Sequence, residues 1–161
     1  ATYIILVAVA APALTQLQIE PIVSHFFVFY YGVLADITPP VALAAYAAAG
    51  IAGSNPFTTG NTAFRLGIAK ALVPFVFVYS PSLLLVAQGF NFYDFIITLI
   101  SAMIGIGLIG IGFTGYLFKS VSTFQRWYLG MISLLFIAPG LSSSIIGLVL
   151  VLPVFVLQLR K

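Results

Sequence analysis

Long apolar runs alternate with short polar clusters along this chain, and the pattern predicts membrane-spanning helices. A spanning helix needs about 20 mostly apolar residues. Residues 1–17 form a first apolar segment, and the cleanest run covers 95–118 without a single charge. A further helix is expected over 62–88, and a last apolar stretch covers 127–159. The expected fold is an all-α, polytopic helical bundle.

Residues 22–53 form two apolar halves that are each too short to cross a membrane. The first half stops at the sequence Asp36-Ile37-Thr38-Pro39-Pro40, and an alanine-rich half follows over 41–53. Helices of this length rise only about 20 Å. Placed end to end, the halves cross once, with the break near the middle of the membrane. The sequence therefore predicts a discontinuous transmembrane helix.

The charges lie at alternate ends of the apolar segments and so indicate the topology. Basic residues lie in or just after 54–66, within 119–126 and at the end of the chain. Glu20 and Asp94 lie at the opposite ends of the segments. The positive-inside rule places the basic ends in the cytoplasm. The last stretch, 127–159, must then enter the membrane and return, as a re-entrant hairpin or as two short helices. One long tilted helix with an outward C-terminus is the alternative.

The composition excludes most soluble classes of protein. Hydrophobic residues make up 62% of the 161 positions and charged residues only 6%, whereas soluble domains carry about 25% charged residues. The net charge of +3 is read as topology information rather than as a nucleic-acid footprint. The absence of cysteine removes thiolate chemistry. A membrane enzyme is not expected, because no nucleophile–base pair or metal-ligating cluster is present.

The break contains the most informative polar residues. Two consecutive prolines, Pro39 and Pro40, remove two backbone donors and push the preceding residues out of helical geometry. Carbonyl groups around 33–37 should therefore lose their helical partners. Together with the Thr38 hydroxyl and the Asp36 carboxylate, they would form an oxygen site suited to Na⁺ or H⁺, while the half-helix starting at Val41 presents its positive end to an anion. A plain proline kink with Asp36 paired to a buried donor is the alternative.

Other polar or glycine-rich features favour structural interpretations. His25 shares a helical face with Asp36, but a local hydrogen bond is favoured over a proton relay. Arg65 and Lys70 are interpreted as anchors at the lipid headgroups. The G-x-G-x-x-G pattern at 105–110 lies inside an apolar span with no preceding strand, so it predicts a close-packing surface and not a dinucleotide site.

Two segments resemble a known family. Residues 21–46, PIVSHFFVFYYGVLADITPPVALAAY, and residues 71–85, ALVPFVFVYSPSLLL, resemble the large membrane subunit of tripartite ATP-independent periplasmic (TRAP) transporters. The similarity is greatest to the fused-permease branch that works with TAXI-type solute-binding proteins. Residues 1–88 would form the C-terminal part of the transport domain, and 89–161 resemble a C-terminal transmembrane extension. The chain is accordingly expected to be the C-terminal fragment of a longer permease.

The resemblance implies a secondary transporter that uses a Na⁺ gradient to import organic anions, commonly carboxylates, by an elevator motion. Residues 1–17 would be the outgoing arm of a re-entrant hairpin, and 22–53 the broken helix. The ion- and substrate-site role carries over to the residues that match the family's broken-helix pattern: Asp36, Thr38, Pro39 and Pro40. Of these, Asp36 and Thr38 are the Na⁺ candidates. Thr2, in the first turn after the hairpin tip, is expected near the site.

The implied partners are a TAXI-type periplasmic solute-binding protein, a small membrane subunit that is separate or fused upstream, the lipid bilayer and an organic anion. No cofactor other than the coupling ion Na⁺ and no nucleic acid are expected. The expected location is a bacterial or archaeal inner (cytoplasmic) membrane. Two alternatives remain. A channel or pore would need a continuous polar stripe, which 95–118 lacks, and a non-transporting membrane scaffold would tolerate an apolar residue at Asp36.

Overall fold

The computed structural model describes residues 2–86, 89–138 and 140–160 of the chain. The regular structure in these residues is helical, which confirms the all-α fold expected from the sequence. Three helical stretches are long and apolar enough to cross a membrane, Pro56–Tyr79, Phe92–Thr114 and Leu141–Leu159. The chain divides into two compact units, Ala1–Val78 and Tyr79–Lys161. Each unit is considered by itself.

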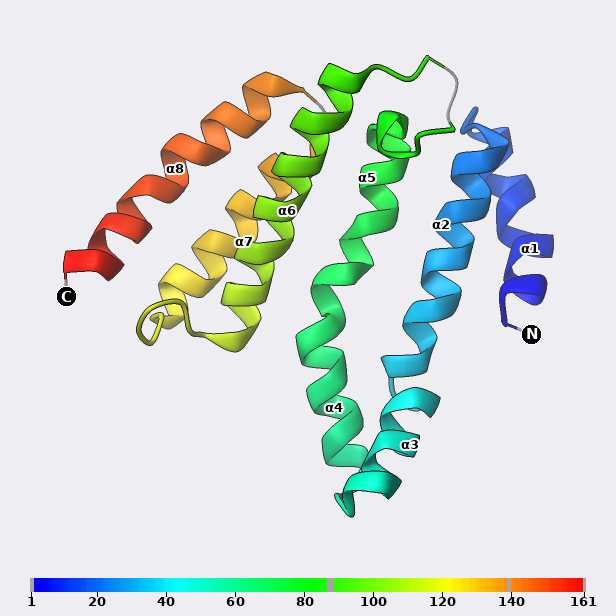
Figure 1. The fold of residues 1–161 in the computed structure, drawn as a ribbon, viewed down its shortest axis with the longest axis horizontal. Coiled ribbons are helices and arrows are strands. Elements are labelled where there is room, and N and C mark those ends of the chain that lie inside the picture. The colour runs from blue at the N-terminus through cyan, green and yellow to red at the C-terminus, as the bar shows by residue number, and fades with distance from the viewer. Residues whose placement is uncertain (1, 87–88, 139, 161) are drawn as a thin grey trace. The chain divides into compact units, whose positions relative to one another are not determined.

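The first unit contains an interrupted helix, as the two prolines predict (Figure 1). Its elements are α1 (Thr2–Gln16), α2 (Pro21–Leu34), the 3₁₀ turn η1 (Ala35–Ile37), α3 (Leu43–Ala52), α4 (Pro56–Gly67), the 3₁₀ segment η2 (Ile68–Leu72) and α5 (Val73–Tyr79). Pro21 occupies the first turn of α2, where its missing N–H costs nothing. The helix α2 runs antiparallel to the continuous stretch formed by α4, η2 and α5.

The helix expected over 62–88 begins earlier and ends earlier than predicted. The Asn55 side chain accepts a hydrogen bond from the Thr58 N–H at 3.1 Å, and Pro56 follows as the first helical residue. The residues just before 62, which lie outside the expected helix, are therefore mostly the first turns of α4. The stretch ends at Tyr79, because Ser80 is not helical and Pro81 begins the separate 3₁₀ turn η3 (Pro81–Leu83).

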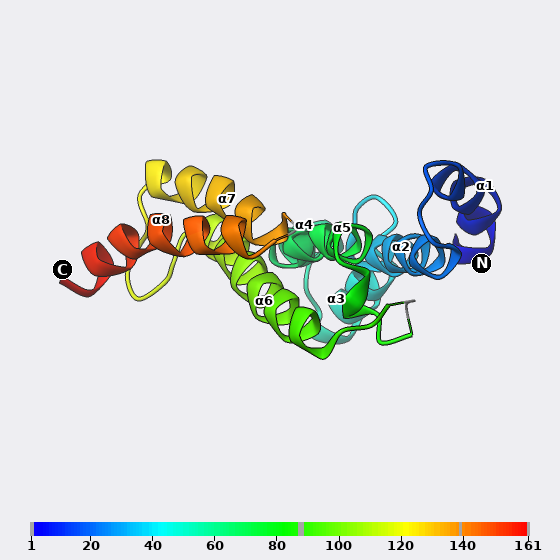
Figure 2. The same ribbon diagram turned by 90° about the horizontal axis from the view of Figure 1, so that it is seen from above.

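The second unit packs three helices, α6 (Phe92–Thr114), α7 (Thr123–Ile137) and α8 (Leu141–Arg160). Asn91 caps the start of α6, and Gly115 ends it in the left-handed conformation at φ 73°. Figure 2 shows α7 and α8 as two separate helices, and they pack against each other. The last stretch therefore divides into two helices, as expected, and the single long helix is wrong. Its entry into the membrane and its return stay a prediction.

The core of the second unit lies among these three helices. Its buried members are Leu108, Val121, Leu129, Ile132, Phe136, Val151 and Val154. A Cβ on Gly105 would lie 3.1 Å from the Phe136 Cβ, so α6 and α7 approach closely at this glycine. Gly107 and Gly110 have no heavy atom within 4 Å of an added Cβ. The expected close-packing surface thus holds for Gly105 but not for the whole motif.

Charged residues mark both ends of the helices in the second unit. The loop that carries Lys119 and the end of α8 lie at one end, and the start of α6, with Asp94 in its first turn, lies at the other (Figure 1). In the first unit, Glu20 at the start of α2 lies opposite the start of α4. Arg65, however, lies in the last turn of α4 and not at its start. The order of ends agrees with the expected topology in the second unit, and the side of the membrane stays a prediction.

Candidate functional site

The break between α2 and α3 is built from the double proline. Thr38, which precedes Pro39, is extended (φ −107°, ψ 114°), because a proline disfavours helical geometry in the residue before it. The chain then turns through Ala42, which is left-handed at φ 36°, before α3 begins at Leu43. The second half-helix therefore starts two residues later than the expected Val41.

Thr38 satisfies two of the carbonyl groups that the break should have left free. Its hydroxyl donates a hydrogen bond to the Leu34 carbonyl at 2.8 Å, and its N–H donates to the Ala35 carbonyl at 3.2 Å. The Asp36 carbonyl has no helical donor, since the residue four positions on is Pro40. Fewer carbonyl groups therefore lack a donor than the sequence predicted for 33–37.

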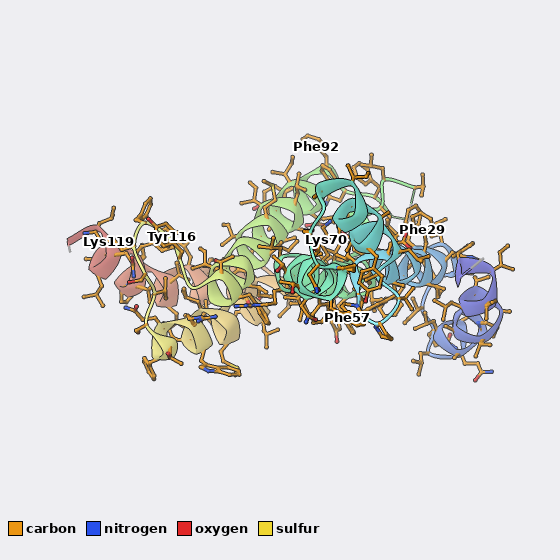
Figure 3. The ribbon with its side chains drawn as sticks, turned by 90° about the horizontal axis from the view of Figure 1, so that it is seen from below. Phe29, Phe57, Lys70, Phe92, Tyr116 and Lys119 are labelled. Atoms are coloured by element: carbon orange, nitrogen blue, oxygen red, sulfur yellow. The ribbon has the colours of Figure 1, made fainter. Side chains whose placement is uncertain are left out.

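A cavity of about 370 Å³ lies beside the break. Two charged side chains line it, Asp36 from η1 and Lys70 from η2. The rest of the wall is apolar or aromatic: Phe29, Tyr30, Val33, Leu34, Ile37 and Ala44. Figure 3 labels Phe29 on α2 and Lys70 on the neighbouring stretch. Thr38, Pro39 and Pro40 shape the break but do not line this cavity. Among the expected site residues with described side chains, only Asp36 lines it.

Lys70 was interpreted from the sequence as a headgroup anchor, and the structure changes that interpretation. Because the helix begins at Pro56, Lys70 lies fourteen residues beyond its first residue and nine before its last. It also sits in the 3₁₀ segment η2, which Pro74 causes by denying the Lys70 carbonyl its usual donor. Sequence reasoning missed Lys70 as a site residue because it started this helix at 62 and not at Pro56.

Tyr31 ties η2 to α2 next to the cavity. Its hydroxyl donates a hydrogen bond to the Ala71 carbonyl at 2.8 Å. Farther along, edge-to-face aromatic pairs join α2 to α5, with Phe27 against Phe75 at 5.5 Å and Tyr30 against Phe77 at 6.1 Å between ring centroids. These contacts fix the position of Lys70 relative to Asp36.

Two glycines of α4 pack against the break, and neither was singled out from the sequence. A Cβ at Gly60 would lie 2.8 Å from the Tyr46 ring and 3.4 Å from Pro39. A Cβ at Gly67 would overlap the end of the Ile37 side chain. The spacing of seven residues places both glycines on one helical face, and this was the available signal.

The helix α1 contacts α2 through Tyr3. The Tyr3 hydroxyl lies 2.8 Å from His25 Nδ1, and the Tyr3 ring meets Phe29 edge-on. His25 thus bonds to a residue 22 positions away and not to a sequence neighbour. The side chain of Thr2, the further residue expected near the site, lies outside the described residues.

The second unit contains a separate cavity of about 270 Å³. Asp94, Thr98 and Ser101 line it from one face of α6, at the spacing of a helical turn. The Ser101 hydroxyl lies 3.0 Å from that of Ser144, which belongs to the first turns of α8. This cavity gives the second unit a polar interior at the end of α6 that carries Asp94.

The interrupted helix and the three apolar spans of the described residues are those of a multi-pass membrane protein. Comparison with protein families agrees: the model described as "Tripartite ATP-independent periplasmic transporter, DctM component" matches residues 1–92. The chain belongs to this family, the large permease component of TRAP transporters, and therefore works with a periplasmic binding protein and a small subunit. No curated protein and no solved structure matches it.

Proposed function

We propose that this chain forms part of the ion and substrate pathway of a Na⁺-coupled transporter that imports organic anions, commonly carboxylates. The observation that carries the proposal is the cavity at the helix break, which Asp36 and Lys70 line together. Ionisable residues within membrane spans mark substrate and ion pathways by default. Broken helices near the membrane midplane supply such sites in secondary transporters.

Asp36 and Thr38 are the proposed Na⁺ ligands. The Thr38 hydroxyl donates a hydrogen bond to the Leu34 carbonyl, so the lone pairs of its own oxygen remain available to a cation. The Asp36 carboxylate supplies the negative charge, and its backbone carbonyl lacks a helical donor. Pro39 and Pro40 keep this backbone open, which is their proposed role in the site.

The proposal extends to the working of the whole transporter. Residues 1–17 would be the outgoing arm of a re-entrant hairpin, and the first unit would move as part of an elevator. The solute-binding protein would be of the TAXI type, the small subunit separate or fused upstream, and the location a bacterial or archaeal inner membrane. No chemical step is assigned to the chain.

The experiment is uptake by the assembled transporter in proteoliposomes, with its binding protein, with and without an inward Na⁺ gradient. A panel of labelled dicarboxylates and amino acids serves as the probe. We expect Asp36→Asn and Thr38→Ala to weaken the Na⁺ dependence by about tenfold or more, because each removes an oxygen ligand or its charge. Expression should be unchanged.

Asp94→Asn is the matched control, because it removes a carboxylate from the other unit. Normal Na⁺-driven uptake in both Asp36→Asn and Thr38→Ala would show that the site assignment is wrong. Downhill flux alone in the unmodified transporter would favour the pore.

A further inference from the structure

Lys70 lies deep within a helix that is apolar enough to span the membrane. It is about 20 Å along the axis from Pro56, and the hydrocarbon core of a bilayer is about 30 Å thick. Arg65, five residues earlier, is exposed like Lys70, but it does not line the cavity. A lysine at such depth is costly unless it pairs with an opposite charge.

The cavity contains one partner for Lys70, but the two charges are not joined. Asp36 and Lys70, whose side chains are both described, form no ion pair within 4 Å. Both nevertheless line the same space, and the remaining wall is apolar or aromatic. Each charge is therefore available to a bound group of opposite sign.

We infer that Lys70 binds the carboxylate of the transported anion, while the aromatic and aliphatic wall receives its hydrocarbon part. This inference rests on the proposed function and names a ligand-binding residue for it. A volume of about 370 Å³ accommodates a small organic ligand. A single ammonium against an apolar wall favours an acid with one carboxylate and an apolar body over one with several charges.

The two charges also provide coupling. The empty cavity, with Asp36 negative and Lys70 positive, is neutral. It is neutral again when one Na⁺ and one carboxylate are bound. With Na⁺ alone it carries a positive charge, and a net charge within the membrane is expensive. The charge of Lys70 therefore raises the free energy of the form that carries Na⁺ without substrate, and so opposes its movement across the membrane.

The test compares Lys70→Gln with Arg65→Gln in the assembled transporter in proteoliposomes. In Lys70→Gln the form with Na⁺ alone becomes neutral, so exchange of ²²Na⁺ for Na⁺ without substrate should rise several-fold. The KM for labelled phenylacetate or succinate, whichever the unmodified protein transports, should rise about 10- to 100-fold, because a charged partner is lost. Arg65→Gln removes the same charge outside the cavity and should change neither quantity.

A chemical rescue separates this role from a folding effect. The 161 residues contain no cysteine, so Lys70→Cys gives this part of the transporter a single thiol. In Lys70→Cys, the thiolate attacks 2-aminoethyl methanethiosulfonate, forms a mixed disulfide and releases methanesulfinate. The product carries an ammonium at position 70. Labelling should lower the KM again in the same preparation, whereas the uncharged methyl methanethiosulfonate should not.

The outcomes are distinct. Unchanged ²²Na⁺ exchange and KM in Lys70→Gln would overturn the role of Lys70 and leave the proposed function intact. Restored uptake in Asp36→Asn/Lys70→Gln would also overturn it, because Lys70 would then only neutralise Asp36. An unmodified transporter without Na⁺-driven uptake of any acid would overturn the proposed function, and the inference with it.

Discussion

The two units handle interrupted hydrogen bonding differently. In the first unit, prolines break α2 from α3 and tighten η2, and side-chain hydroxyls of Thr38 and Tyr31 take up carbonyl groups. In the second unit, α6 runs for 23 residues without interruption. Charged groups meet α6 near its ends. Asp94 lies in its first turn, and Arg126 of α7 donates a hydrogen bond to the Gly112 carbonyl in its last turn.

Proline alone does not explain the difference. Pro153 lies inside α8 and Pro12 inside α1, and both helices continue through them. A single proline removes one hydrogen bond, and the helix tolerates this loss when its neighbours are regular. Two in succession also force the preceding Thr38 out of the helix. In the first unit, the charged side chains Asp36 and Lys70 therefore lie where prolines have opened or tightened the backbone.

The largest effect is expected when the interruption between α2 and α3 is removed. Replacing Pro39 and Pro40 together by Ala restores two backbone donors, so α2 and α3 should merge into one helix. We expect Na⁺-driven uptake to fall by about tenfold or more, since the oxygen site is lost, while the protein still inserts. Pro153→Ala in α8 is the control and should leave uptake unchanged. Full uptake by the double variant would mean that the break is not needed.

A second test addresses the packing that holds the break in place. Gly60→Ala would place a Cβ 2.8 Å from the rigid Tyr46 ring. Overpacking of this kind costs about 1–3 kcal/mol, so the thermal unfolding temperature in detergent should fall. Gly50→Ala on α3 meets nothing within 4 Å and should be neutral or stabilising. Equal unfolding temperatures for the two variants would contradict the close approach of α4.

Gly67→Ala should cost less than Gly60→Ala, because it meets only the end of the flexible Ile37 side chain. Ile37→Val removes that terminal methyl group and should restore the stability of Gly67→Ala. A lack of rescue would place the strain elsewhere in α4.

The smallest effect sharpens the comparison between the units. Tyr31→Phe removes the hydrogen bond to the Ala71 carbonyl, and Tyr128→Phe removes a bond of 3.1 Å to the Leu150 carbonyl in the second unit. Each should lower the unfolding free energy by about 1 kcal/mol. Only Tyr31→Phe should also raise the KM for substrate, because Tyr31 positions the segment that carries Lys70. A shift in KM in both variants would mean that the second unit also reaches the site.

The sequence predicted the features that depend on neighbours along the chain. The double proline acts within four residues of itself, so the break was predictable. The return of the last stretch was predicted from the basic residues at both of its ends. By contrast, Asn55-Pro56 is equally typical of a turn and of a helix start, and the capping bond to Thr58 decides between them.

The features that depend on distant residues were missed. Gly60 and Gly67 become informative only once Tyr46 and Ile37 are known to lie opposite them. The shift in the start of α4 moves Lys70 away from the expected interface, and only the packing of η2 on α2 brings it near Asp36. Nothing local to position 70 carries that information.

Arg126 links two steps in the synthesis of the second unit. Its guanidinium donates hydrogen bonds to the Gly112 carbonyl at 2.7 Å and to the Phe113 carbonyl at 3.0 Å, yet it belongs to α7. Since a chain is made from its N-terminus, the end of α6 leaves the ribosome before Arg126 has been added. Those two carbonyl groups must stay hydrated until α7 docks. The last carbonyl groups of α6 therefore gain these hydrogen-bond donors only when α7 has formed and packed against α6.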